Sequence, residues 1–86
     1  MSADADALIA QYIEENPLRP GPADARLKDF GVAVWALISY LTRAVGGDVE
    51  QAATDFEVPV AAVEAARAYY ERHRAPIDAR IAVSAA

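Results

Sequence analysis

The stretch GGDVEQAATDFEVPVAAVEAAR, residues 46–67, decides the fold. Asp48 is placed to cap a helix over about residues 49–56. After a short break, a second helix is expected over about residues 60–73, because Pro59 is tolerated in a first helical turn. The stretch therefore predicts two helices joined by a tight turn.

The spacing within this stretch is typical of a helix-turn-helix. Ala52 and Ala53 are small residues where two helix backbones would cross, and Phe56 follows as the next apolar residue. Val58 fits the inward-pointing position of the turn, but Glu57 stands where glycine is common, which predicts a longer or differently shaped turn. The second helix is expected to bury Val63, Ala66 and Tyr70 on one face.

The charge of the same stretch disfavours contact with DNA. It holds five carboxylates before its first base, Arg67. Base recognition requires Arg, Lys, Asn or Gln on the exposed side of the second helix. The residues expected on that side are Pro59, Ala61, Ala62, Glu64, Ala65 and Ala68. The spacing therefore favours a helix-turn-helix, whereas the chemistry disfavours DNA binding through residues 59–68.

The helix expected before this stretch, over residues 32–45, is apolar on nearly all sides. Such a helix is buried nearly all round, and a chain of 86 residues offers little protein to cover it. Either the two ends of the chain wrap it or a second subunit does. The residues predicted to form a homodimer interface are Trp35, Ile38, Tyr40, Leu41 and Val45.

The rest of the chain extends this core on both sides. Residues 1–16 predict an N-terminal helix, and residues 17–31 form a loop rich in proline and glycine with one short extended piece. Residues 32–75 form the helix-turn-helix core, and residues 76–86 form a short C-terminal helix or tail. The predicted fold is all-α, a small helical bundle with at most one short strand.

Composition narrows the function classes. The net charge is −5, which disfavours general attraction to nucleic acid or anionic lipid. There is no cysteine, no signal peptide is recognisable, and the longest apolar run is about half of a bilayer span. We expect a cytoplasmic protein without membrane contact. No catalytic, cofactor-binding or metal-binding set is recognised, since His73 is the single histidine and lacks convergent partners. The expectation is a non-enzymatic protein.

Several motifs resemble one family, the domain of unknown function 433. They are GVAVWALISYL, a glycine turn, DVEQAATDF, V-P, and VEAARAYYERH followed by IDARI. The similarity covers about residues 30–81, and Val34-Trp35, Asp55-Phe56 and Tyr69-Tyr70 carry most of it. Before residue 30 the chain departs from the family, because ADARLKDFG replaces a basic, glycine-containing segment. The resemblance implies a homeodomain-like helix-turn-helix, a dimer, and the antitoxin half of a toxin–antitoxin pair with a PIN-like nuclease.

Two functions follow as expectations. The first is a protein-interaction module resembling an antitoxin that dimerises and binds a nuclease-type toxin. Its predicted partner-binding residues are Glu64, Tyr69, Ile77 and Ile81, although the sequence leaves open which of Tyr69 and Tyr70 is buried. The alternative is a DNA-binding transcriptional repressor. Its predicted nucleic-acid contacts are Arg19, Arg26, Lys28, Arg67 and Arg80.

Overall fold

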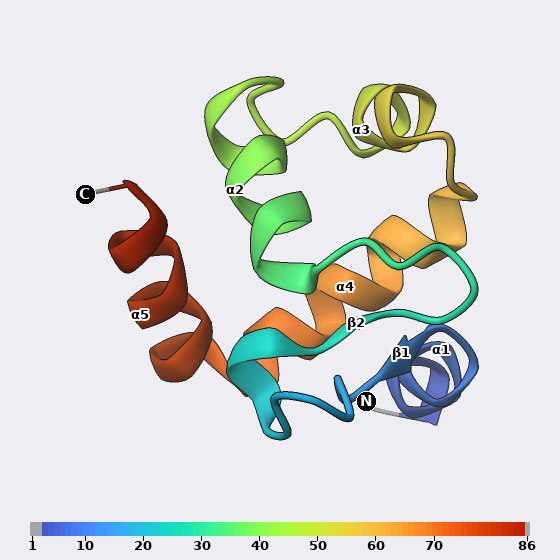
Figure 1. The fold of residues 1–86 in the computed structure, drawn as a ribbon. Helices are drawn as coiled ribbons and strands as arrows, with labels where there is room; N and C mark the ends of the chain where they lie inside the picture. Colours follow the sequence, from blue (N-terminus) through green and yellow to red (C-terminus); the bar gives the residue numbers. More distant parts are fainter. Residues whose placement is uncertain (1–2, 86) are drawn as a thin grey trace.

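The computed structural model describes residues 3–85 as a mostly helical domain with a small antiparallel sheet (Figure 1). In chain order the elements are α1 (Ala3–Tyr12), β1 (Ile13–Glu14), the 3-10 helix η1 (Pro22–Asp24), β2 (Arg26–Leu27), α2 (Val34–Arg43), α3 (Val49–Phe56), α4 (Val60–Arg72) and α5 (Arg74–Ala85). The prediction of a mostly helical fold is confirmed. The prediction of at most one strand is wrong, because a second two-residue strand follows α1.

The small sheet joins the end of α1 to the proline-rich loop. Ile13 pairs with Leu27 and Glu14 pairs with Arg26 in antiparallel register. Ile13 and Leu27 are both buried, so the pairing turns two apolar side chains into the core. The first helix therefore ends at Tyr12, earlier than predicted, because the next two residues are extended to make this pairing.

Helix α4 lies at the centre of the fold, in contact with α1, α2 and α3 (Figure 1). Five of its thirteen residues are buried, namely Ala62, Val63, Ala65, Ala66 and Tyr69. Ala62 and Ala65 were predicted to be exposed, and this prediction is wrong. Because three helices pack around α4, its sides are covered by other parts of the same chain. The exposed residues of α4 are Arg72 at its end and a stripe formed by Val60, Glu64, Arg67 and Glu71.

Helix α5 is an integral part of the core. It spans twelve residues, longer than the short helix or tail predicted for residues 76–86. Ile77 in its first turns is fully buried. The Arg80 guanidinium lies 4.3 Å from the centre of the Trp35 ring on α2 and pairs with Asp24 of η1 at 3.2 Å. These contacts hold α5 against both α2 and the proline-rich loop.

The turn between α3 and α4 comprises three residues, as predicted. Glu57 adopts the left-handed conformation, with φ 59° and ψ 47°, and the Val58 amide donates to the Ala53 carbonyl at 3.0 Å. This geometry favours glycine, which explains why glycine is common at this point of the motif. The structure thus contains two helices joined by a tight turn, and the homeodomain-like assignment stays a prediction.

The burial of Ile77 gives a test of the core. We expect Ile77→Ala to lower the free energy of unfolding by about 2–5 kcal/mol, because it leaves a cavity among fully packed side chains. Val83 lies on the same helix and is 72% exposed. Its Val83→Ala control is expected to change stability by less than about 0.5 kcal/mol. Urea unfolding of both variants measures the difference, and equal effects would contradict the packing described.

The left-handed residue in the turn gives a second test. Glu57→Gly is expected to raise the free energy of unfolding by about 0.5 kcal/mol, because relief of the left-handed strain exceeds the entropic cost of glycine. Glu50→Gly, within regular α3, is expected to lower it by about 0.5–1 kcal/mol. Thermal and urea unfolding compare the two variants. A destabilised Glu57→Gly protein would show that the strain is absent.

Candidate protein-interaction surface

Helix α3 and its two ends carry exposed carboxylates, which we call the acidic α3 surface: Asp48, Glu50, Asp55 and Glu57. Two of them have structural tasks. Asp48 caps α3 by accepting the Gln51 amide at 3.0 Å, and Asp55 accepts the Gln51 side-chain amide at 2.8 Å. Within residues 3–85, the side chains of Glu50 and Glu57 make no hydrogen bond or ion pair, so their charges remain available to a partner.

Asp55 also connects α3 to α2 through a hydrogen bond. The Tyr40 hydroxyl donates a hydrogen bond to the Asp55 carboxylate, and the rings of Tyr40 and Phe56 meet edge to face with centres 5.1 Å apart. This hydrogen bond raises the pKa of Tyr40, because it favours the protonated phenol, and burial and the nearby carboxylate charge raise it further. The acidic α3 surface is therefore held in place by contacts with a neighbouring helix.

The exposed stripe of α4 is poorly suited to reading a DNA groove. A recognition helix presents several donors to base edges. On α4 the single base in the stripe is Arg67, which has Glu64 one turn before it and Glu71 one turn after it. The close packing of α1 removes the broad face that a groove-binding helix needs. The geometry thus agrees with the charge pattern in disfavouring DNA contact through α4.

Three of the five predicted nucleic-acid contacts are used inside the fold. Arg26 pairs with Glu14 across the sheet at 2.8 Å. The Lys28 ammonium donates to the Ala10 carbonyl at 2.6 Å, where a cation meets the negative end of the α1 dipole. Arg80 is held by Trp35 and Asp24, as described above. Arg19 and Arg67 are exposed and make no ion pair within residues 3–85. A phosphate would therefore compete with existing partners at most of the predicted sites.

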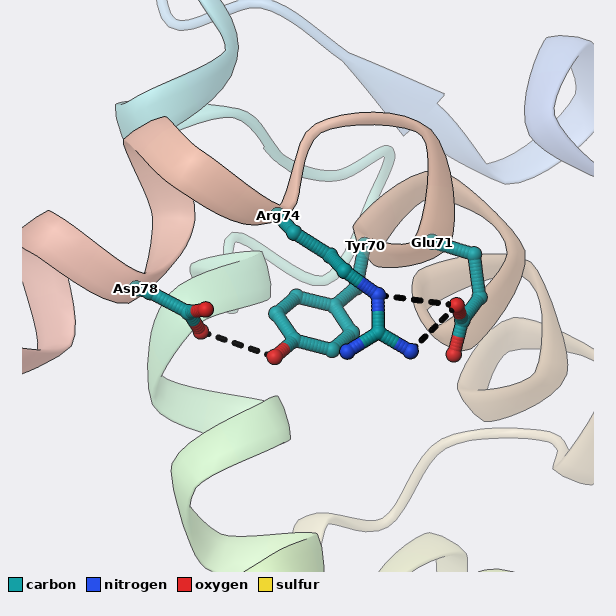
Figure 2. A network of polar contacts seen from close by, with 4 residues as sticks. All are labelled: Tyr70, Glu71, Arg74 and Asp78. Atoms are coloured by element: carbon teal, nitrogen blue, oxygen red, sulfur yellow. Dashed lines mark hydrogen bonds and ion pairs between the residues drawn. The ribbon is translucent and has the colours of Figure 1, made fainter.

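Four side chains connect the end of α4 to the start of α5 (Figure 2). The Tyr70 hydroxyl donates to Asp78 at 2.7 Å, and Arg74 donates to Glu71 at 2.6 and 3.1 Å. The Arg74 guanidinium lies 5.2 Å from the centre of the Tyr70 ring. The hydrogen bond to Asp78 is the main cause of a raised Tyr70 pKa. Together these contacts fix the angle between the two helices.

Beside this network lies a concave site that we call the α2–α4 hollow, with a volume of about 210 Å³. Its lining residues are Ile38, Leu41, Thr42, Gly47, Arg67, Tyr70 and Glu71. A second hollow, which also involves α1, shares Arg67 and Glu71 with the first. The α2–α4 hollow is smaller than the roughly 300–1,000 Å³ of small-molecule sites, so its size suits one inserted side chain.

The predicted dimer interface lies mostly inside the monomer. Ile38 and Leu41 are 3% and 4% exposed, because α4 and α5 pack on α2. Tyr40 is tied to Asp55, and Trp35 is half-buried beneath Arg80. Val45 is also half-buried. The sequence left open whether a second subunit or the chain itself covers the apolar surface of this helix. In the structure, the chain's own helices cover most of it.

Two of the four predicted partner-binding residues are also in the core. Ile77 is fully buried and Tyr69 is 9% exposed, and neither lines one of the two hollows, so neither is placed for direct partner contact. The reason is the close packing of α5 and of the α4 face that carries Tyr69. Ile81 is half-buried and Glu64 is exposed. Tyr69 is thus the buried member of the tyrosine pair, and Tyr70 lies at the rim of the hollow.

Sequence reasoning missed the α2–α4 hollow as a site. Thr42, Gly47 and Glu71 come from three separate segments, and no spacing along the chain connects them. Arg67 was identified only as a phosphate contact. The one signal in the sequence was that Arg67 is the first base after a long acidic stretch.

The Tyr40–Asp55 hydrogen bond predicts a dependence of stability on alkaline pH. The folded-state pKa of Tyr40 is raised above its ordinary value of 10.0. The contribution is therefore complete below about pH 10 and is lost as pH rises through the raised pKa. We expect Tyr40→Phe to be less stable than wild type at neutral pH and to lose less stability above pH 10. Urea unfolding across this range tests it. The control is Tyr12→Phe, because the Tyr12 hydroxyl makes no hydrogen bond within residues 3–85.

Within residues 3–85, no cluster of three or more His, Cys, Asp or Glu side chains could hold a metal ion. No helix in the same range has the length and apolar character needed to cross a membrane. No family model, curated protein or solved structure matches the chain, so the resemblance to domain of unknown function 433 stays a prediction.

Proposed function

We propose that the chain is a non-enzymatic protein-interaction module that binds a basic surface of another protein. The observation that carries this proposal is the position of unpaired carboxylates on α3. Glu50 and Glu57 are exposed and uncommitted, whereas Arg26, Arg72, Arg74 and Arg80 are all in intramolecular ion pairs. Each of these pairs also uses one carboxylate, so the net charge stays at −5, and the unpaired carboxylates of α3 lie in a stretch, residues 48–57, that has no Lys or Arg.

An acidic surface of this kind favours a cationic partner in two ways. It attracts the partner during diffusion, and it repels polyanions such as DNA that would compete for the same face. Because α3 is clamped to α2 through Tyr40 and Asp55, the carboxylates are held in a fixed arrangement, which lowers the entropic cost of binding.

The resemblance to domain of unknown function 433 suggests which partner to test first. It implies an antitoxin-like role beside a PIN-like nuclease. A nuclease that binds nucleic acid needs a basic cleft, and the acidic α3 surface would compete with nucleic acid for such a cleft. We therefore propose a nuclease-type toxin as the partner class.

The test is a binding measurement between the full chain and a PIN-like nuclease encoded beside its gene. We expect a complex at micromolar concentration or below, weakened by at least about tenfold in Glu50→Lys, because like charges then face each other. The matched control is Ala75→Lys combined with Ala82→Lys. It changes the net charge equally on exposed positions of α5, and we expect its affinity to stay within about twofold of wild type.

Three results would contradict the proposal. The first is no complex at micromolar concentration. The second is an equal loss of affinity in Glu50→Lys and in the α5 control, which would indicate only a net-charge effect. The third is salt-dependent binding of a DNA duplex that is lost in Arg26→Ala and Arg80→Ala, which would favour the repressor function instead.

A further inference from the structure

The turn formed by Lys28–Gly31 projects from the fold between β2 and α2. Hydrogen bonds define its base: the Leu27 amide donates to the Val32 carbonyl at 2.7 Å, and the Gly31 amide donates to the Leu27 carbonyl at 3.1 Å. The Lys28 amide donates to the Tyr12 carbonyl at 2.7 Å. The turn is therefore fixed to α1 and β2 rather than free to collapse onto the surface.

This turn displays an aromatic ring next to a carboxylate. Phe30 is 41% exposed. Asp29 is exposed, adopts a left-handed conformation with φ 68°, and makes no hydrogen bond or ion pair within residues 3–85. The other large apolar side chains exposed in this range are Leu18, Val60 and Val83. None of them is adjacent in sequence to an acidic residue, so Phe30 is distinguished by its neighbour.

The α2–α4 hollow has the complementary chemistry. Ile38 and Leu41 line it with the small part of each side chain that is exposed, 3% and 4%. Arg67 contributes a guanidinium without an ion-pair partner in the described residues. The carboxylate of Glu71 is already neutralised by Arg74. The unpaired charge at the hollow is therefore the positive charge of Arg67. It lies beside apolar residues, in a hollow whose size suits one side chain.

We propose that a second copy of this chain inserts Phe30 into the α2–α4 hollow and pairs Asp29 with Arg67. An aromatic side chain would fill the apolar part, and an arginine and a carboxylate form a charge-assisted pair that fixes the orientation. If the two copies are related by a twofold axis, each copy gives one turn and receives the other. This contact shares Ile38 and Leu41 with the predicted dimer interface but does not use Trp35, Tyr40 or Val45. It is independent of the acidic α3 surface and its partner.

The test is sedimentation equilibrium of the full chain from micromolar to high-micromolar concentration at moderate salt. We expect a reversible monomer–dimer equilibrium. Phe30→Ala, Asp29→Asn and Arg67→Asp are each expected to weaken self-association, by about tenfold or more for Phe30→Ala. Asp29→Asn removes the charge while keeping a residue that tolerates the left-handed conformation. Circular dichroism confirms that each variant is folded.

A charge exchange gives the sharper result. Asp29→Arg alone is expected to weaken the dimer, and combining it with Arg67→Asp is expected to recover most of the lost affinity, because the pair is rebuilt with opposite polarity. Arg19→Asp, at an exposed arginine outside the hollow, serves as the matched control and is expected to leave self-association unchanged.

Each alternative result overturns the proposal. A wild-type chain that stays monomeric at high-micromolar concentration excludes the contact. A dimer that is unaffected by Phe30→Ala, or one that the charge exchange fails to restore, shows that another surface joins the two copies. None of these outcomes alters the expected binding of a nuclease through Glu50, so the two proposals can fail separately.

Discussion

The packing of α1, α2 and α3 around α4 is the constraint on which the rest of the structure depends. Ala62, Ala65 and Ala66 make it feasible, because side chains this small let neighbouring helices approach the α4 backbone closely. Once α4 is enclosed, it has only a narrow stripe to offer to any other molecule. Helix α4, which the sequence predicted as the second helix of a helix-turn-helix, thereby serves as the central element of the core.

The same enclosure determines how the charges are used. Arg72 pairs with Asp6 and so connects α4 to α1, and Arg26 and Arg80 attach the sheet and α5 to their neighbours. Partly exposed pairs of this kind add little free energy individually. Each uses one arginine and one carboxylate, so the net charge is unchanged, and the carboxylates of Glu50 and Glu57 remain exposed and unpaired at α3. The composition thus sets the net charge, and the packing decides which of the charged side chains are paired.

Much of the helical order could be predicted from sequence, because caps, glycines and prolines mark local boundaries. Asp48 caps α3 as expected, and α3 ends before Glu57, where Val58 and Pro59 indicated a turn. The second buried face of α4 could not be predicted, since alanine is compatible with either burial or exposure. The Ile13–Leu27 pairing and the α2–α4 hollow also escaped prediction, because they depend on contacts between residues distant along the chain.

The position of Trp35 has a practical consequence for spectroscopy. It is the sole tryptophan of the chain, and the Arg80 side chain of α5 lies over its indole ring. Intrinsic fluorescence excited at the indole band therefore reports on one local event, the docking of the C-terminal helix onto α2. Departure of that helix would expose the ring to water and shift its emission to longer wavelength, which allows detachment of α5 to be followed without a label.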